Sequence, residues 1–508
     1  MTEMSDLRSS YWIDSAPGTP HPPLDRDVTV DVAVIGGGVA GLSTAWELTR
    51  AGLSVAVLEA GRIAEGVTGH TSAKLSALQS LVYSRLRHVH GTEGARLYAR
   101  SQTEAIEHVA EVAELLGVDC EWEHRDAYTY ARSPHRVAEL RAEAAAAREA
   151  GLAASFVTET DLPFPVAGAV RATGQAQFHP RKYLLALADD LRAQGALVHE
   201  HTSVFGLQED GACQVTAETG AQVTARDVVV ATHYPVFDRA LLFTRLTPRR
   251  EIVIAAPLPV ELAPSGMYIT PEEDTRSVRT APYEDGKRLL IVVGEKFTPG
   301  TGDPAVRFDR LLKWTAAHFP DAEPRYAWAT QDTFPCDSAP LVGLLHPTAR
   351  HTYVATGFGG WGMSGGIMAG SLLTALITGS EPPPWKDLYT PRRVRSVLRA
   401  APRFLRNQAD VAHHFVGDRV RPSTVTSVDR LPRDSGAIVR LDGRRSAVYR
   451  DVDGKLHALS ARCTHMGCLV AFNSAERAWE CPCHGSRFDT DGQVVQGPAT
   501  RELEQRDI

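Results

Sequence analysis

Hydrophobic and polar residues follow two periods along this chain, and the first change of period falls near the N-terminus. Residues 28–60 read VTVDVAVIGGGVAGLSTAWELTRAGLSVAVLEA, an apolar run of strand length, a glycine turn, a stretch with helical period and a second apolar run. The pattern predicts one βαβ unit. A similar sequence of strand, glycine-rich turn and helix returns over residues 351–379, HTYVATGFGGWGMSGGIMAGSLLTALITG.

The segment between these two units mixes both periods. Residues 90–118 and 133–152 have the spacing of amphipathic helices, and Ser133 is a candidate N-cap for the second of them. Residues 240–330 are rich in strand-like stretches such as REIVIAAPL and KRLLIVVGEKF. We therefore expect a second sheet built over the first domain.

The C-terminal part has short strands only. Asp-Gly pairs at Asp442-Gly443 and Asp453-Gly454 divide them, as in tight hairpins of a small antiparallel domain. The whole pattern predicts an α/β Rossmann-type domain with an inserted α+β domain, followed by a small all-β domain. The expected parts are a leader, the two-part domain, a connector rich in proline and basic residues, and the all-β domain, at residues 1–29, 30–380, 381–418 and 419–508.

Composition and charge narrow the class of protein. The chain has 508 residues, 43% of them hydrophobic and 23% charged, as expected for a globular protein of two or three domains. Its net charge of −7 gives no reason to expect nucleic acid or an anionic membrane as a partner. The first 27 residues have no signal-peptide pattern and no run reaches the roughly eighteen apolar residues of a membrane span. We expect a cytoplasmic location.

The first glycine turn has the spacing of a dinucleotide site. Gly36, Gly38 and Gly41 form G-x-G-x-x-G, and Glu59 ends the following strand, where an acidic side chain can accept hydrogen bonds from a ribose hydroxyl. NAD and FAD both fit such a turn. Because the second turn, Gly357 to Gly366, lacks an acidic residue on a following strand, the simpler interpretation is one FAD held at both ends. The first turn is then expected at the pyrophosphate and the second at the flavin.

Residues 463–486, CTHMGCLVAFNSAERAWECPCHGS, contain four of the seven cysteines. Cys463-x-His465 is followed after fifteen residues by Cys481-x-x-His484. Zinc fingers usually pair Cys with Cys and His with His, whereas a Rieske [2Fe–2S] centre takes one thiolate and one imidazole from each of two loops. The order favours the Rieske centre. The three remaining cysteines, Cys120, Cys213 and Cys336, are scattered and are expected in the core.

These motifs together resemble FAD-dependent oxidoreductases of the D-amino-acid-oxidase type that carry a C-terminal Rieske cluster. The matching segments include VIGGGVAGLSTAWELTRAG, GVTGHTSAKLS, DTFPCDSAPLVG, TGFGGWGMSGG and the cluster motif. The resemblance implies [2Fe–2S] ligation by Cys463, His465, Cys481 and His484, and a disulfide between Cys468 and Cys483. The residues implied at the FAD are Gly36, Gly38, Gly41, Glu59, His70, Thr71, Ser72, Val204, Gly357, Gly359, Gly360, Gly362, Met363 and Ser364.

The same resemblance implies further roles. His70, in a G-x-T-x-H setting, is a candidate for a covalent bond to the flavin, with an ordinary hydrogen bond as the alternative. Ser486 stands where high-potential Rieske domains carry a serine donor, whereas Phe488 replaces their tyrosine donor. With one of two donors missing, we expect a cluster potential above plant-type ferredoxins and below the top of the Rieske range.

The implied reaction is oxidation of a C–H bond beside an amine nitrogen, with hydride transfer to flavin. Candidate residues to orient the substrate are His233, Tyr268, Arg279, Lys296 and Trp361. Because a flavin takes two electrons and a cluster passes one, we expect a one-electron acceptor, a protein or a quinone, and a dehydrogenase rather than an oxidase.

Three other functions compete with this one. A Rieske oxygenase needs a mononuclear iron, but the adjacent His413 and His414, near Asp410, do not readily face one metal from a regular helix. An electron carrier without its own small substrate is the second. A flavoenzyme acting on a biosynthetic intermediate that is not an amine is the third.

Overall fold

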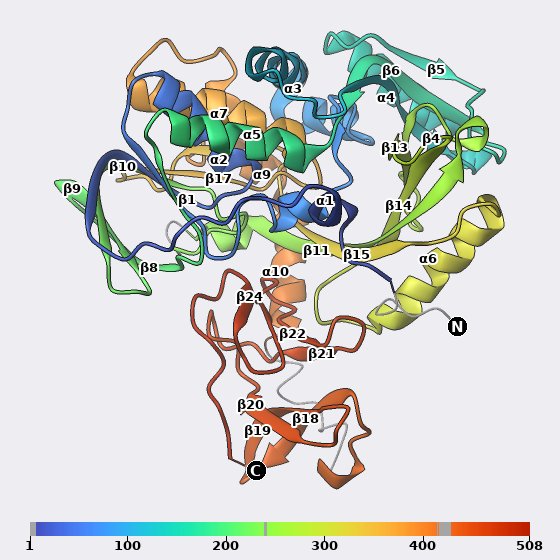
Figure 1. Cartoon of the computed structure of the whole chain (residues 1–508). Helices are drawn as coiled ribbons and strands as arrows, with labels where there is room; N and C mark the ends of the chain where they lie inside the picture. The colour runs from blue at the N-terminus through green and yellow to red at the C-terminus, as the bar shows by residue number, and fades with distance from the viewer. Residues whose placement is uncertain (1–6, 238–240, 414, 416–427, 508) are drawn as a thin grey trace.

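A computed structural model describes residues 7–237, 241–413, 415 and 428–507. Two large sheets stand next to each other in the N-terminal part, and the C-terminal β domain lies beneath both of them (Figure 1). Among the described residues no helix combines the length and the apolar character needed to cross a bilayer.

The first sheet has the doubly wound arrangement expected for the dinucleotide domain. Its main path is β16-β17-β10-β1-β2-β7, and the hairpin β8–β9 continues from β10. All pairs from β17 to β7 are parallel, and β16 is an antiparallel edge. The strands are β1 (Val28–Ile35), β2 (Val55–Leu58), β7 (Leu197–His199), β8 (Val204–Asp210), β9 (Ala212–Ala217), β10 (Gln222–Val230), β16 (Leu341–Leu344) and β17 (Thr352–Thr356).

Helices α2 (Val39–Arg50), α5 (Pro180–Ala193) and α7 (Gly362–Thr378) lie together on one side of this sheet (Figure 1). Glycines allow α2 and α7 to pack closely, because a Cβ on Gly366 would come within 2.7 Å of the Val39 side chain. Since α2 follows β1 and α7 follows β17, and both strands run in the same direction, the two helices begin at the same edge of the sheet.

The second sheet has nine strands in the path β15-β11-β14-β13-β12-β4-β6-β3, with β5 beside β6. It combines the strands expected between residues 240 and 330 with earlier ones, so the inserted domain is assembled from separate stretches of the chain. The strands are β3 (Lys74–Leu75), β4 (Glu123–Ala131), β5 (Ala154–Val157), β6 (Gly168–Gln177), β11 (Leu246–Pro259), β12 (Met267–Ile269), β13 (Arg276–Pro282), β14 (Lys287–Phe297) and β15 (Tyr326–Pro335).

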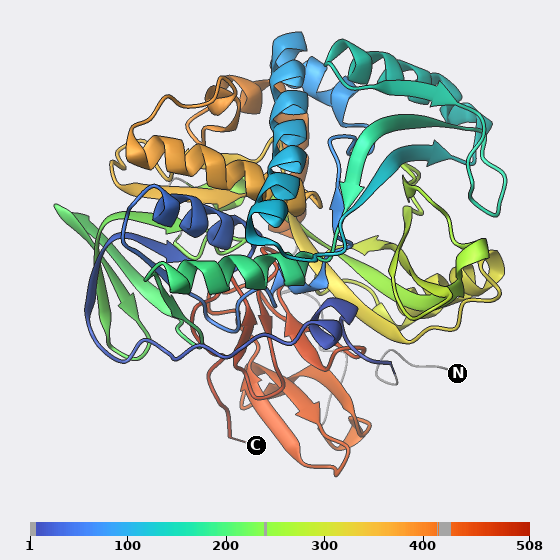
Figure 2. The same ribbon diagram turned by 45° about the horizontal axis from the view of Figure 1, so that its top comes forward.

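Three further helices belong to this part, α3 (Val82–Leu116), α4 (Val137–Glu149) and α6 (Pro304–His318). The long α3 runs between the two halves of the N-terminal part (Figure 2) and is kinked at Gly91, whose φ is +81°. The expected N-cap at Ser133 is wrong: a 3₁₀ turn (Pro134–Arg136) comes first, and the Ser133 side chain caps neither element. The proline allows the tighter turn to precede the helix.

The leader is packed against the domain that follows it. Its helix α1 (Tyr11–Ser15) begins after Ser10, whose hydroxyl accepts a hydrogen bond from the Trp12 backbone N–H. Trp12 is fully buried and donates from its indole N–H to the carbonyl of Thr71 at 2.8 Å. The leader therefore supports the segment that follows β2.

The C-terminal domain consists of a three-stranded and a four-stranded antiparallel sheet, as the all-β pattern predicted. Asp442 and Gly443 have φ of +47° and +75°, the conformation of a two-residue hairpin turn. Cys468 and Cys483 form a disulfide. The strands are β18 (Ser435–Leu441), β19 (Arg444–Arg450), β20 (Leu456–Ser460), β21 (Ala471–Asn473), β22 (Ala478–Glu480), β23 (Arg487–Phe488) and β24 (Val494–Gln496), preceded by the connector helices α8 (Lys386–Tyr389), α9 (Arg395–Arg399) and α10 (Ala401–Ala412).

Candidate functional site

A cavity of about 860 Å³ lies where β1, β2 and β10 end and where the two large sheets meet. Both glycine turns line it, as expected of a cofactor held at two ends. Ten of the fourteen residues predicted at the FAD line the cavity, namely Gly36, Gly38, Glu59, His70, Thr71, Ser72, Val204, Gly360, Gly362 and Met363. Gly41, Gly357, Gly359 and Ser364 are outside its described lining.

The first turn requires its glycines. A Cβ on Gly41 would stand 1.8 Å from the carbonyl oxygen of Gly36, so only glycine lets α2 start this close to β1. Gly38, the N-cap of α2, places no side chain between the cavity and the first amides of the helix. This bare helix N-terminus fits the pyrophosphate of a dinucleotide.

Glu59 holds the same turn together. Its carboxylate accepts hydrogen bonds from the backbone N–H groups of Gly37 at 2.7 Å and Gly61 at 2.9 Å. Burial raises the pKa of Glu59, although these two hydrogen bonds oppose the rise. Each carboxylate oxygen can accept a further bond, so the predicted ribose contact remains compatible with this geometry.

The second turn is linked to the candidate His233. The Asp332 carboxylate accepts a hydrogen bond from the Gly360 N–H at 2.6 Å, and its other oxygen lies 3.2 Å from Nε2 of His233. His233 and Asp332 both line the cavity. The structure therefore brings His233 to the predicted flavin end of the cavity, next to a carboxylate that the sequence did not single out.

Strand β11 contributes two charged residues to this end of the cavity, Arg249 and Glu251. Arg249 pairs with Asp332 and Glu251 with Thr330 across β11 and β15, and paired residues of antiparallel strands share a face. Burial raises the pKa of Glu251. Sequence reasoning missed both residues, because the run Arg249-Arg250-Glu251 has no alternation of charged and apolar residues that would separate the two faces of the strand.

Two of the other candidates lie away from the cavity. Tyr268 is fully buried, stacks on Tyr128 with ring centroids 4.7 Å apart and donates a hydrogen bond to Asp161. Arg279 is 1% exposed, and its guanidinium donates to the carbonyls of Ser72 at 2.9 Å and Ala73 at 2.6 Å. Arg279 therefore supports the cavity wall from behind, and burial lowers its pKa to about 9.

Lys296 and Trp361 lie close to the cavity but outside its described lining. The Lys296 ammonium stands 3.8 Å from the ring centroid of Phe334, which does line it. Trp361 is the N-cap of α7, and its backbone N–H donates to the carbonyl of Phe358 at 3.1 Å.

His70 has a defined ring orientation. Its Nδ1 lies 2.8 Å from the carbonyl oxygen of Gly66 and 3.0 Å from that of Glu65, so Nδ1 carries the proton. Burial lowers the pKa of His70, which keeps the ring neutral. Nε2 is then the unprotonated nitrogen of a residue that lines the cavity.

The four predicted cluster ligands converge in the C-terminal domain. Cys463 and Cys481 are buried, and the rings of His465 and His484 stand 5.0 Å apart at 88°. Both Nδ1 atoms are buried and have no hydrogen-bond partner among the described residues. Burial lowers the pKa of His465 to about 4 and of His484 to about 3. Two neutral imidazoles with unpartnered Nδ1 atoms and two cysteines outside any disulfide fit a [2Fe–2S] cluster.

The sulfurs of Cys468, Cys481 and Cys483 also lie within 4.8 Å of one another. Because Cys468 and Cys483 are joined by the disulfide, they are not available as metal ligands, and Cys481 remains the ligand of this group. Next to Cys463, the Ser486 hydroxyl donates to the sulfur and accepts from the Ala499 N–H at 3.0 Å. Phe488 is fully buried and has no hydroxyl to donate.

The four predicted ligands Cys463, His465, Cys481 and His484 form the cluster cradle, which lies directly beside the cofactor cavity. The C-terminal domain completes the cavity wall with residues from its loops and short strands, Ala475, Glu476, Arg487, Val494, Val495, Gln496, Gly497, Ala499 and Thr500. The His484 ring contacts the rings of Tyr234 and Phe243, with centroids 6.1 and 5.3 Å away. The two predicted redox sites thus share a boundary, which the sequence alone did not reveal.

A buried ion pair fixes this boundary. Arg250 is fully buried and its guanidinium contacts the carboxylates of Glu476 and Glu480 in the C-terminal domain. On the same face of the sheet, the Gln331 amide donates to the carbonyl of Gly485 at 2.9 Å. One face of β11 and β15 therefore holds the C-terminal domain, while Arg249, Asp332 and Glu251 belong to the other.

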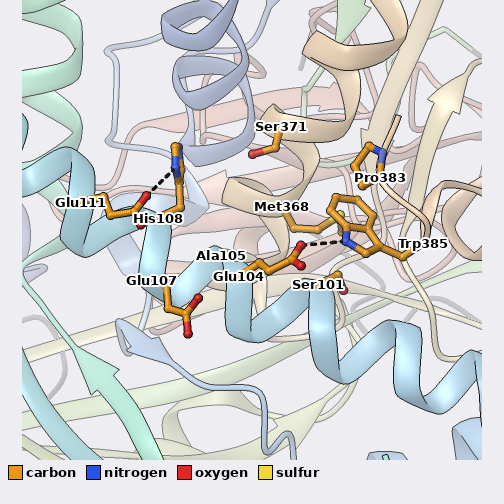
Figure 3. Close-up of a pocket in the computed structure, with 10 residues that line it drawn as sticks. All are labelled: Ser101, Glu104, Ala105, Glu107, His108, Glu111, Met368, Ser371, Pro383 and Trp385. Atoms are coloured by element: carbon orange, nitrogen blue, oxygen red, sulfur yellow. Dashed lines mark hydrogen bonds and ion pairs between the residues drawn. The ribbon is translucent and has the colours of Figure 1, made fainter. Parts of the chain in front are cut away.

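A second cavity of about 280 Å³ lies between α3 and α7 (Figure 3). Trp385 donates from its indole N–H to Glu104 at 3.0 Å, and His108 lies 4.0 Å from Glu111. None of the residues predicted from the sequence lines it. The alternative iron site at Asp410, His413 and His414 includes His414, which lies outside the described residues.

Comparison with known proteins agrees with both sites. The model of the FAD dependent oxidoreductase family matches residues 31–376, and that of the Rieske [2Fe-2S] domain matches residues 422–506. The chain is 31% identical over 501 residues to the "Putative Rieske 2Fe-2S iron-sulfur protein YhfW" of Bacillus subtilis (strain 168), which covers 98% of this chain and 97% of the relative.

Two further matches cover the N-terminal part. Gamma-glutamylputrescine oxidoreductase of Escherichia coli (strain K12) is 26% identical over 404 residues, 74% of this chain and 90% of that protein. The crystal structure of glycine oxidase from Geobacillus kaustophilus superposes with a TM-score of 0.59 at 21% identity, over 72% of this chain and 99% of that chain.

Proposed function

Because this chain belongs to the FAD-dependent oxidoreductase family and carries a C-terminal Rieske [2Fe–2S] domain, we propose that it oxidises a small amine or amino acid and passes the electrons singly to an acceptor. Its cofactors are FAD and a [2Fe–2S] cluster. When bound, the flavin takes hydride from the C–H beside the substrate nitrogen and the cluster carries one electron at a time.

The observation that carries this proposal is the shared boundary of the two sites. Residues of the Rieske domain complete the wall of the FAD cavity, and the cluster histidine His484 contacts Tyr234, which lines that cavity. An enzyme that returns its electrons directly to oxygen has no use for a cluster at this position. The arrangement favours a dehydrogenase whose acceptor is a one-electron protein or a quinone.

The charges at the flavin end of the cavity support an amino-acid substrate. Arg249 offers a guanidinium that can bind a carboxylate in a bidentate manner, while Glu251 and Asp332 lie on the same face of the sheet and can bind an ammonium group. A zwitterion bound between these groups is held with its Cα–H in a fixed position, as hydride transfer requires. The amine chemistry in the name of the gamma-glutamylputrescine relative is consistent with this class.

We assign the proton transfer of this reaction to His233. Its Nε2 faces Asp332, so the pair can accept a proton from the substrate ammonium and leave the neutral amine that transfers hydride. Arg279 and Lys296 take supporting positions in this scheme: Arg279 holds the backbone of residues 72 and 73, and Lys296 lies over Phe334.

The test is an anaerobic panel of amino acids, N-methylated amino acids and γ-glutamylated diamines added to the holoprotein. We expect one class to bleach the flavin absorbance and to produce the electron paramagnetic resonance signal of the reduced cluster. Turnover with a one-electron acceptor should then exceed turnover with oxygen. Reduction by a redox protein or NAD(P)H, with none of the panel active, would contradict the proposal and favour an electron carrier.

A further inference from the structure

Tyr234 occupies the boundary between the FAD cavity and the cluster cradle. It follows β10, it is 2% exposed, and it lines the cavity. On its other side its ring contacts both predicted histidine ligands, with centroid distances of 6.5 Å to His465 and 6.1 Å to His484. Of the described residues that line the cavity, Tyr234 is the one whose aromatic ring contacts both His465 and His484.

The backbone around Tyr234 is held in an unusual conformation. His233 has a φ of +63°, in the left-handed region that non-glycine residues rarely adopt. The Thr356 hydroxyl donates to the His233 carbonyl, and the Thr232 hydroxyl donates to that of Tyr234 at 2.8 Å. Such a conformation persists where surrounding contacts impose it. In this conformation the two neighbouring side chains point to different sites. His233 contacts Asp332 at the cavity, and Tyr234 contacts the cluster histidines.

We propose that Tyr234 is the contact through which electrons cross from the FAD cavity to the Rieske cluster within one chain. The inference rests on the proposed function, because it assumes that flavin and cluster exchange electrons. In each crossing one electron leaves the reduced flavin and enters the oxidised cluster. The second crosses after a one-electron acceptor, protein or quinone, has reoxidised the cluster, and the substrate protons pass to solvent.

Phe243 provides a matched control within the same contact. Its ring lies closer to His484 than that of Tyr234, with a centroid distance of 5.3 Å, but Phe243 is outside the described cavity lining. The Tyr234 hydroxyl donates to the Phe243 carbonyl at 3.4 Å, so both residues belong to one packed unit. Replacing either residue by leucine removes a ring that packs on His484. Only replacement of Tyr234 also removes the ring that reaches from the cavity to the cluster histidines.

The experiment compares holoprotein with the substitutions Tyr234→Leu, Tyr234→Phe and Phe243→Leu. Flavin is photoreduced anaerobically with EDTA as electron donor, so no substrate is needed, and cluster reduction is followed by absorbance and by electron paramagnetic resonance. We expect Tyr234→Leu to slow the crossing by at least about tenfold, and Tyr234→Phe and Phe243→Leu to stay within about twofold of the unchanged protein. Cluster g-values and midpoint potentials, measured separately, should stay unchanged in all three.

Equal rates in Tyr234→Leu and the unchanged protein would overturn the inference, as would equal slowing by Phe243→Leu. Absence of any cluster reduction after photoreduction in the unchanged protein would also overturn it. Because the assay supplies electrons by light, an inactive substrate panel combined with a slow Tyr234→Leu variant would contradict the proposed substrate and leave the electron path supported.

Discussion

Replacing Arg250 by leucine is expected to loosen the Rieske domain from the FAD domain. The Arg250 guanidinium is fully buried and contacts Glu480, also fully buried, and Glu476 at 2.5 Å. Leucine would leave both carboxylates without this cation. Arg487 stays 2.9 Å from Glu476 and compensates only in part.

The burial of this ion pair sets the expected cost of the substitution. Breaking a buried ion pair by removing one partner typically costs about 3–5 kcal/mol, because the remaining charge is buried alone. Burial raises the pKa of Glu476, but Arg250 and Arg487 outweigh this effect and lower it from 4.5 to about 2. Of the two cations, Arg250 makes the larger contribution to this lowering.

The measurement is urea denaturation of the holoprotein, with visible circular dichroism of the cluster reporting the Rieske domain and flavin fluorescence reporting the FAD domain. We expect Arg250→Leu to lower the midpoint of the cluster signal more than that of the flavin signal. Arg249→Leu is the matched control, because Arg249 is the neighbouring residue on the opposite face of β11. The double change Arg250→Leu with Glu480→Leu should recover much of the loss, because it removes both charges.

The contribution of Glu476 to stability should decrease as the pH falls. The pKa of Glu476 is lower in the folded protein, so its contribution to stability is present above pH 4.5 and is lost as the pH falls toward about 2. In Arg250→Leu the pKa is higher, and this contribution should shrink and disappear at a higher pH. If Arg250→Leu and Arg249→Leu shift the cluster midpoint equally, the buried ion pair does not hold the domains together and the reasoning is refuted.

Four further expectations concern the two cofactor sites. Purified protein should contain one FAD and one [2Fe–2S] cluster per chain, and zinc in place of iron would contradict the assignment of the tail. Ser486→Ala should lower the midpoint potential of the cluster in a redox titration and Phe488→Tyr should raise it, because hydrogen bonds to the sulfurs raise the potential. If the midpoint of Phe488→Tyr stays unchanged although the new hydroxyl reaches the sulfur, this hydrogen-bond explanation is wrong. If His70 bonds the flavin through Nε2, acid precipitation should leave the flavin with the protein and His70→Ala should release it, whereas complete release from the unchanged protein would exclude the bond. Arg249→Gln should raise KM for an amino-acid substrate at least about tenfold while sparing an amine without a carboxylate, and an equal effect on both would argue against a carboxylate contact.

The sequence revealed those parts of the site whose residues are close together along the chain. The G-x-G-x-x-G turn and the paired Cys-x-His and Cys-x-x-His motifs depend on local geometry, so their spacing predicted a dinucleotide and a Rieske cluster. The choice of FAD over NAD came from the second glycine turn and the family resemblance. The site between them depends on pairing across strands. Arg249 meets Asp332 only because β11 and β15 are antiparallel neighbours, and no local pattern encodes that pairing.

The same limit explains the misplaced candidates. Arg279 and Tyr268 lie on strands for which the sequence does not show which face lines the cavity. In the structure Arg279 packs on Trp12 and Tyr268 bonds to Asp161, so both side chains support the fold. The contact of Tyr234 with His484 joins residues 250 positions apart. Contacts of this kind join two domains of the chain, and no single sequence segment predicts them.

The completion of the FAD cavity by residues 475–500 has a consequence for biogenesis. The N-terminal domain leaves the ribosome first and can fold while the Rieske domain is still being made. Until that domain docks, the wall formed by Glu476, Arg487 and Val494 is missing and the cavity is open on that side. We therefore expect flavin to enter more easily before the Rieske domain docks, and docking to close the flavin in.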